Sequence, residues 1–267
     1  MAQPKNAMEI FKLLDKSNCR KCGKPTCLAF AAGVFTGEKR IDECPSLSSE
    51  IVERYGDKAD HKKPGEQEFE EAIAQLKEEI AAIDLASAAT RVGGRYADGK
   101  LTIPILGKEF SVDSAGDIST SIHVNRWIAP PVLDYIINCK GTEPSGKWVP
   151  LRELNGGKDW HRLFGQRCEK PLKKVADEYT DIFEYMIRVF NGKQAENHYE
   201  SDISLILHPL PKLPILICYW KPEDGLESNL NIFFDETAED NLNIQSIYIL
   251  AAGLALMFEK IALHHGK

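Results

Sequence analysis

The sequence lacks the motifs that mark the commonest nucleotide-dependent and hydrolytic enzymes. It contains no GxGxxG fingerprint or P-loop, no Gly-x-Ser-x-Gly elbow and no His-Glu-x-x-His pair. Its seven histidines are scattered, and His61, His264 and His265 fall in a polar stretch or at the chain end. Nucleotide chemistry and triad hydrolysis are therefore unsupported. We expect an electron carrier or cofactor-binding protein more than a stand-alone enzyme.

Long hydrophobic runs and an excess of positive charge are also missing. No run of 18 apolar residues occurs, and residues 1–15 hold no apolar stretch of signal-peptide length. Lys and Arg number 33 against 40 Asp and Glu, which gives a formal net charge of −7. We therefore expect a cytoplasmic protein with no membrane insertion and no nucleic-acid partner.

Four cysteines near the N-terminus are the most specific feature that is present. Cys19, Cys22, Cys27 and Cys44 follow the frame C-x2-C-x4-C-x16-C. A [4Fe-4S] cluster needs one thiolate for each iron, and Pro45 after the last cysteine repeats a feature of ferredoxins. Gly23 permits close backbone approach. We expect Thr26 to cap a helix over residues 27–36 that ends at Gly37 and directs its positive end at the cluster.

Other uses of cysteine compete with this interpretation. A structural zinc site usually takes two C-x2-C knuckles, and only Cys19 and Cys22 form one. Disulfides are disfavoured because nothing indicates export to an oxidising compartment. The remaining cysteines are isolated, which indicates packing roles; they are Cys139, Cys168 and Cys218.

Residues 8–47 resemble a known iron–sulfur module. The shared features are Asn18, the cysteine loop, the Ala-rich helix, Gly37 and Cys44-Pro45. The module is similar to the N-terminal domain of the corrinoid iron–sulfur protein large subunit of the acetyl-CoA pathway, and to one in the Rnf complex B subunit. The resemblance implies a low-potential [4Fe-4S] cluster held by the four cysteines. Arg20-Lys21 departs from the small or neutral residues common there and should raise the potential.

The later residues resemble an uncharacterised family of anaerobes. Residues 100–257, with the segments LTIPILGKEFSVD and NLNIFFDETA, are similar to a domain of unknown function often joined to this cluster module. We therefore expect a cluster domain over residues 1–56, a linker over 57–67 and a larger domain over 68–267. The linker prediction depends on its Gly, Pro and alternating charges.

The coarse pattern predicts an α+β fold, in which a small helical four-cysteine domain precedes antiparallel strands packed with helices. Ser46 is expected to cap a short helix, and residues 66–90 read as one amphipathic helix. Predicted strands cover residues 100–106 with 109–113, 203–208 with 213–220, and 229–235. Predicted helices cover residues 131–139, 159–190 with a break at Pro171, and 241–264.

One loop of the second domain is a candidate cofactor site. Residues 155–165 combine glycines with Trp160, His161 and Arg162, and nearly spell the D-x-H-x-x-G signature of base-off corrinoid proteins. The match fails because Gly165 follows His161 by four positions. A Gly-rich loop opening a packing helix is the simpler interpretation, and the four isolated histidines 123, 161, 198 and 208 favour structural roles. Trp127 is one of the aromatic residues that could line a cofactor pocket.

Two hypotheses follow. In the first, the cluster passes electrons to a corrinoid such as cobalamin, bound by the second domain or by a redox partner protein, which is a corrinoid protein or its activator. In the second, the chain is a non-catalytic adaptor or redox-sensing scaffold with a structural cluster.

Overall fold

The computed structural model describes residues 6–35, 38–56, 64–196 and 198–265. The chain divides into two compact units, Met1–Ala72 and Ile73–Lys267, and the division falls inside one helix. Each unit is described by itself. The predicted end of the first cluster helix at Gly37 and most of the predicted linker lie outside the described residues.

The first unit is helical and builds a small core around its cysteines. Its elements are α1 (Ala7–Leu13), α2 (Cys27–Phe35), the 3-10 turn η1 (Ile41–Glu43), α3 (Ser49–Gly56) and the start of α4 (Pro64–Ala81). Helices α1 and α2 pack together, and Phe30 and Ala31 of α2 are fully buried. Helix α3 begins three residues after Ser46, so Ser46 is not its cap.

The long helix predicted over residues 66–90 is two helices. Helix α4 ends at Ala81, and α5 (Leu85–Arg91) begins after Asp84, whose carboxylate accepts the Ala86 N–H at 3.0 Å. An aspartate at this position competes with helix continuation because it satisfies a free N–H of a new helix. Helix α4 also begins at Pro64, inside the predicted linker.

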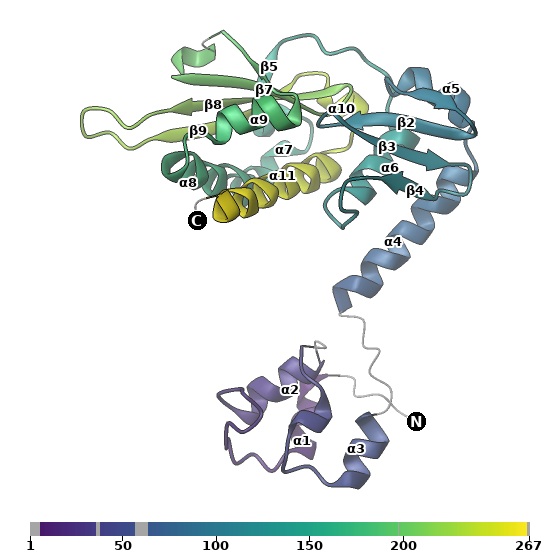
Figure 1. The fold of residues 1–267 in the computed structure, drawn as a ribbon, viewed down its shortest axis with the longest axis vertical. Helices are drawn as coiled ribbons and strands as arrows, with labels where there is room; N and C mark the ends of the chain where they lie inside the picture. Colours follow the sequence, from purple (N-terminus) through teal and green to yellow (C-terminus); the bar gives the residue numbers. More distant parts are fainter. Residues whose placement is uncertain (1–5, 36–37, 57–63, 197, 266–267) are drawn as a thin grey trace. The chain divides into compact units, whose positions relative to one another are not determined.

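The second unit contains two antiparallel sheets, which confirms the predicted α+β class (Figure 1). The first has the order β1-β2-β3-β4, and the second β5-β9-β8-β7-β6. The strands are β1 (Arg95–Ala97), β2 (Lys100–Ile105), β3 (Lys108–Asp113), β4 (Ile118–Thr120), β5 (Trp148–Pro150), β6 (Lys193–Gln194), β7 (Ile203–Leu210), β8 (Leu213–Trp220) and β9 (Asn229–Asp235). The predicted hairpins and third strand are confirmed; β1, β4, β5 and β6 are two- or three-residue strands that the sequence analysis missed.

Turn chemistry sets the register of the two hairpins. Leu106 and Gly107 between β2 and β3 both have positive φ, 48° and 76°, as a two-residue hairpin of the primed kind requires. In the β7–β8 hairpin the pairing shifts between Leu207 and Leu210. The Leu106 N–H donates to the His208 carbonyl at 3.2 Å and so links the two sheets.

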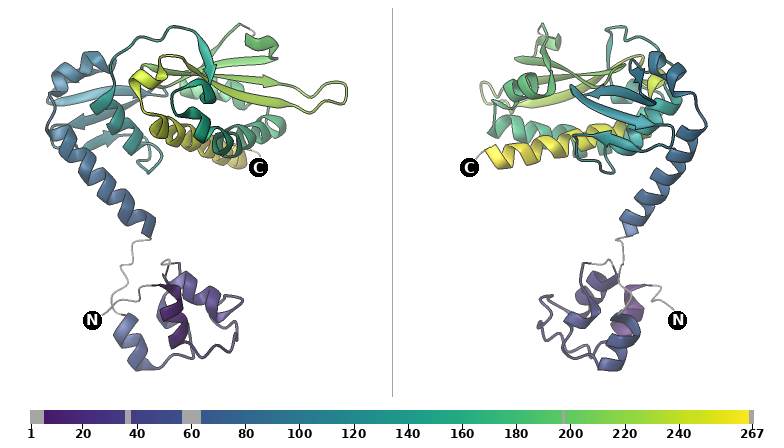
Figure 2. Two further views of the ribbon diagram at one scale, coloured as in Figure 1. Left: turned by 180° about the vertical axis from the view of Figure 1, so that it is seen from behind. Right: turned by 45° about the vertical axis from the view of Figure 1, so that its right-hand side comes forward.

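Helices cover one face of the second sheet (Figures 1 and 2). Ile215, Ile217 and Ile232 on this face belong to the same core as Leu172 and Phe258 from the helices. The helices of this unit are α5, α6 (Ala129–Asn138), α7 (Gly157–Phe164), α8 (Lys170–Glu178), α9 (Ile182–Phe190), α10 (Ala238–Asn241) and α11 (Ile244–His265), with 3-10 turns at η2 (Leu151–Glu153) and η4 (His198–Glu200).

The helix predicted over residues 159–190 does not break at Pro171. A π-helical turn, η3 (Gly165–Glu169), joins α7 to α8, and the chain leaves the helix only after Glu178. Proline lacks an N–H, so the carbonyl one turn earlier has no α-helical donor. The helix widens at this point instead of ending, as π-turns inside helices commonly do.

Helix α11 is long and apolar enough to cross a membrane by length and composition. Its residues Ile244–Leu263 have a mean hydropathy of 1.7, and half of this stretch is buried inside the second unit. Ala251, Ala255 and Phe258 pack in the core there. Core helices reach the same hydropathy, so this packing accounts for the apolar composition.

Candidate functional site

The cysteine loop of the first unit has an unusual backbone. Lys16, Asn18 and Arg20 have positive φ values of 59°, 50° and 61°, and Gly23 follows at 74°. Non-glycine residues rarely adopt this conformation, since it costs roughly 1–2 kcal/mol except at Asn or Asp. Left-handed residues alternating with others form concavities that gather N–H groups and favour anions. Such positive φ values at three non-glycine residues mark a constrained loop around the first two cysteines.

Asn18 ties this loop to the start of α2 by two hydrogen bonds. Its side-chain Oδ1 accepts the Cys27 N–H at 2.7 Å, and its own N–H donates to the Cys27 Sγ at 3.3 Å. Thr26 caps α2 as predicted, because its Oγ1 accepts the Ala29 N–H at 3.0 Å. Cys27 thus sits at the N-terminal end of α2 with the Asn18 N–H aimed at its sulfur.

Three of the four thiols border one small core, and the four differ in exposure. Cys27 and Cys44 are 6% and 5% exposed, and they pack with Leu14, Phe30 and Ile41. Cys22 is half-buried against the same core, whereas Cys19 is exposed. The site therefore has a buried side and a side that faces solvent.

Hydrogen bonds and burial move the thiol pKa values in opposite directions. The Lys21 N–H and the Ser17 hydroxyl lower the pKa of Cys19. Burial raises the pKa of Cys44, and the nearby charges of Cys22, Asp15 and Cys19 raise it further. Cys44 therefore lies within electrostatic range of both Cys19 and Cys22.

Positive charge gathers beside the exposed part of the loop. Lys39 pairs with Glu43 at 2.6 Å, and this bond raises the Lys39 pKa, to which the charge of Cys22 adds. The Lys39 Nζ lies 3.9 Å from the position that a Cβ on Gly23 would take. Arg20 and Lys21 are exposed on the loop itself.

These residues fit an iron–sulfur cluster. Four thiols form the donor set, and the Asn18 N–H already donates to the Cys27 sulfur, as backbone N–H groups do around such clusters. Among the residues that the structure describes, no group of three or more His, Cys, Asp or Glu side chains is arranged to hold a metal ion. Cys19, Cys22, Cys27 and Cys44 are the residues that would hold a cluster, which would supply one-electron transfer there.

The structure does not bring together the four cofactor candidates predicted in the second unit. Trp160 lies on α7 and contacts Tyr248 of α11, with ring centroids 4.9 Å apart and ring planes tilted by 37°. His161 and Arg162 are exposed on the same helix. Trp127 instead meets Gly253, five residues further along α11. Trp160 and Trp127 therefore contact different turns of α11. Trp127 also lines an apolar cavity.

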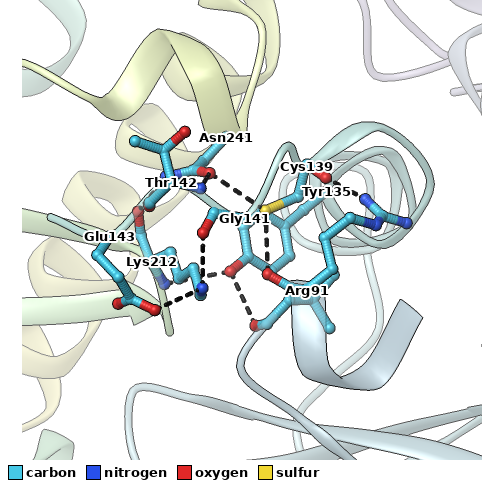
Figure 3. Close-up of polar contacts among 9 residues, drawn as sticks. Arg91, Tyr135, Cys139, Gly141, Thr142, Glu143, Lys212 and Asn241 are labelled. Carbon is cyan, nitrogen blue, oxygen red and sulfur yellow. Dashed lines mark hydrogen bonds and ion pairs between the residues drawn. The ribbon is translucent and has the colours of Figure 1, made fainter. Parts of the chain in front are cut away.

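A buried polar network in the second unit escaped the sequence analysis (Figure 3). Lys212 is 8% exposed, and its Nζ donates to the Gly141 carbonyl and to Glu143, both at 2.7 Å. Its backbone N–H donates to the Tyr135 hydroxyl at 3.1 Å. Asn241 accepts hydrogen bonds from Thr142 and from the Cys139 thiol.

This network has a structural role, because it joins separate chain segments and its ionisable groups are too buried to react. Burial raises the pKa values of both Tyr135 and Cys139, so both stay protonated near neutral pH. Each is at most 1% exposed. Cys168 and Cys218 are also fully buried, in keeping with packing roles for the three isolated cysteines. No spacing in the sequence could have revealed the network, because its members come from distant segments.

A second buried group binds the loop that follows Gly141. The Asp235 carboxylate is fully buried and accepts hydrogen bonds from the Gly146 N–H at 2.7 Å and the Ser145 N–H at 3.1 Å. Thr237 adds its N–H at 3.0 Å and its hydroxyl at 2.7 Å. Burial raises the pKa of Asp235, but these donors together lower it more, so it ends below its usual value. The carboxylate is a structural anchor between β9 and this loop.

Comparison with known proteins assigns both parts of the chain. Residues 84–257 match the family described as "Domain of unknown function (DUF3786)", and residues 14–46 match the family described as "Putative Fe-S cluster". The second match covers the cysteine frame. No solved structure matches the chain significantly.

Curated relatives match only the N-terminal region. The acetyl-CoA decarbonylase/synthase complex subunit gamma of Methanocaldococcus jannaschii is 49% identical over 49 residues, which is 18% of this chain and 10% of that protein. The corrinoid/iron-sulfur protein large subunit of Moorella thermoacetica is 49% identical over 45 residues, 17% of this chain and 10% of that protein. The chain thus spans about a tenth of the length of these relatives.

Proposed function

Since the chain belongs to the family described as Domain of unknown function (DUF3786) and carries an iron–sulfur domain, we propose that it is a low-potential electron-transfer protein. Cys19, Cys22, Cys27 and Cys44 hold a [4Fe-4S] cluster in this proposal. The electrons go to a corrinoid, which is bound by the second unit or by a partner protein. The module that the chain shares with a corrinoid/iron-sulfur protein supports this acceptor.

The arrangement around Cys27 is the observation that carries the proposal. A cluster, when bound, would supply one-electron transfer at low potential. Asn18 orients the loop and directs an N–H at the Cys27 sulfur, which stabilises added negative charge. Cys27 and Cys44 anchor the centre in the core, and the exposed Cys19 side leaves a short path to a partner.

Charge near the exposed side fits an acidic redox partner. Arg20 and Lys21 are exposed on the loop, where they would attract an acidic surface within a Debye length of about 8–10 Å. The partner in this proposal is a corrinoid protein or its activator, and the setting is an anaerobic cytoplasm. Electron transfer should then slow as salt rises.

A corrinoid bound to this chain itself would need an axial ligand. His161 is the candidate, with Trp160 and Arg162 beside it on α7 and Trp127 as a more distant candidate contact. The exposed position of His161 makes it reachable by a large macrocycle. No described His, Cys, Asp or Glu groups with it to form a metal site.

The test combines cluster-loaded protein with a corrinoid acceptor. Protein purified and reconstituted anaerobically is reduced with dithionite, freed of reductant and mixed with a cobalt(II) corrinoid protein or free cobalamin. We expect the cobalt(II) absorption to fall as cobalt(I) forms, and a Cys22→Ala variant with a disrupted cluster to leave it unchanged. Full reduction by the Cys22→Ala variant, or none by the loaded protein, would overturn the proposal.

A redox-sensing scaffold is the second candidate function. Cys27 and Cys44 belong to the core of the small unit, so a bound cluster would also hold that unit folded. In that case oxidation should change the stability or partner binding of the chain without electrons reaching a corrinoid. The same mixing experiment separates the two candidates.

A further inference from the structure

The second unit contains an apolar cavity that the proposed function does not use. It has a volume of about 540 Å³ and lies between α11, the β2–β3 turn and residues 121–128. Figure 1 labels α11, β2 and β3, and residues 121–128 lie between β4 and α6 in the sequence. The volume lies within the roughly 300–1,000 Å³ typical of small-molecule sites.

The walls are shaped by a close approach of Trp127 to α11. A Cβ added to Gly253 would lie 2.5 Å from the Cβ of Trp127, so only glycine admits the side chain there. Glycine inside a helix costs about 1 kcal/mol relative to alanine, and here it lets the Trp127 indole lie against the helix and line the hollow. Ile122, Leu254 and Met257 line it as well, and none of them is fully buried.

The charged groups of the lining have one sign. Lys108 from the start of β3 and Lys260 from α11 are exposed, and the lining contains no acidic residue. Within the described part of the chain, neither lysine makes an ion pair. Two such lysines on a mostly acidic chain leave positive charge beside an apolar interior.

We propose that this cavity binds a small amphipathic anion, with its apolar body against Trp127 and its acidic group between Lys108 and Lys260. A carboxylate or other anionic head on an aliphatic or ring-shaped body has this chemistry. The apolar body gains free energy by leaving water, and the lysines select the charge of the head. The proposal does not depend on the iron–sulfur centre.

The test measures binding of decanoate to the full chain by isothermal titration calorimetry, with 1-decanol as the uncharged probe. We expect one decanoate per chain and weaker binding of the alcohol. A Lys108→Gln/Lys260→Gln variant should weaken decanoate binding about tenfold, since each partly exposed ion pair contributes up to about 1 kcal/mol. The affinity for the alcohol should stay unchanged.

Control variants separate the cavity from the rest of the surface. Lys158→Gln/Lys170→Gln removes the same charge from exposed positions on α7 and α8 and should leave decanoate binding unchanged. Ile122→Trp fills the cavity and should abolish binding of both probes, and Met257→Trp provides a second filling variant. Circular dichroism melting of each variant shows whether it folds.

Three results would overturn the proposal. The first is absence of decanoate binding to the folded wild-type chain. The second is equal binding of acid and alcohol that the lysine substitutions leave unchanged. The third is wild-type affinity in a folded cavity-filling variant. An amphipathic peptide helix that binds this face while decanoate does not would assign the hollow to a protein partner instead.

Discussion

Asn18 should control how firmly the first unit holds its cluster. Its side chain accepts the Cys27 N–H at 2.7 Å, and its backbone stands at a φ of 50°. Replacing it with alanine removes a hydrogen bond of about 1 kcal/mol. It also forces a Cβ-bearing residue without a local polar group into the left-handed region, at about 1 kcal/mol more. Asn18→Ala should therefore destabilise the loop by about 2 kcal/mol.

Asn18→Gly separates these two contributions. Glycine adopts positive φ freely, so this variant loses the hydrogen bond alone, at about 1 kcal/mol. Asn18→Asp keeps both an acceptor and tolerance of positive φ, and is the matched control. A tenfold change in rate corresponds to 1.4 kcal/mol, so cluster loss through loop opening should accelerate about 30-fold in the alanine variant and about fivefold in the glycine variant.

The assay follows the decay of the visible cluster absorption in urea under anaerobic conditions. The order alanine, glycine, then aspartate and wild type is expected for the rate of loss. Equal rates for alanine and glycine would show that backbone strain is absent. Wild-type rates for all three variants would refute the role assigned to Asn18.

The remaining predictions concern charge and buried polar groups. Arg20→Ser/Lys21→Ser should lower the cluster potential by tens of millivolts in protein-film voltammetry, because two exposed positive charges no longer favour the more negative reduced state. An unchanged potential would contradict the charge argument. The depressed pKa of Asp235 contributes stability above its unfolded pKa of about 3.9, which is lost as the pH falls through the folded value. Asp235→Asn should therefore lower the free energy of unfolding, measured in urea at pH 7, by on the order of 3 kcal/mol. The variant should also lose less stability than the wild type below about pH 4. If it keeps the wild-type loss of stability in acid, another group is responsible. Asn241→Leu should lower the free energy of unfolding at pH 7, measured in urea, by about 3 kcal/mol, because buried hydrogen-bonding groups lose their partner. A loss under about 1 kcal/mol would show that the network rearranges without Asn241.

The elements that could be predicted are those whose signals are local. Strand β9 was predicted with its observed bounds, and the β2–β3 and β7–β8 hairpins were predicted from pairs of short strands close in sequence. The helix break at Asp84 and the continuation through Pro171 were predicted wrongly. At Asp84 a helix cap outweighed the hydrophobic periodicity, and at Pro171 a π-turn let the helix continue past a residue that commonly ends one. Both outcomes depend on packing that the sequence does not display.

The candidate sites show the same contrast. The spacing of four cysteines within 26 residues is enough to predict a metal-cluster site, and the preference of threonine for helix N-caps predicts the role of Thr26. The hydrogen bonds of Asn18, the position of Lys39 and the cavity at Trp127 depend on contacts between separated segments. The sequence analysis could name Trp127 as an aromatic residue suited to lining a pocket, but it could not identify Gly253 as the residue that Trp127 contacts.

The most direct test of the central claim is the metal content and redox state of the four-cysteine site. Anaerobically reconstituted protein is analysed for iron and acid-labile sulfide, and its electron paramagnetic resonance spectrum is recorded before and after reduction by dithionite. The account predicts four irons and four sulfides per chain, a cluster signal that appears on reduction by one electron, and loss of both in Cys22→Ala and Cys44→Ala. Zinc in place of iron, or unchanged iron and signal in the cysteine variants, would contradict it.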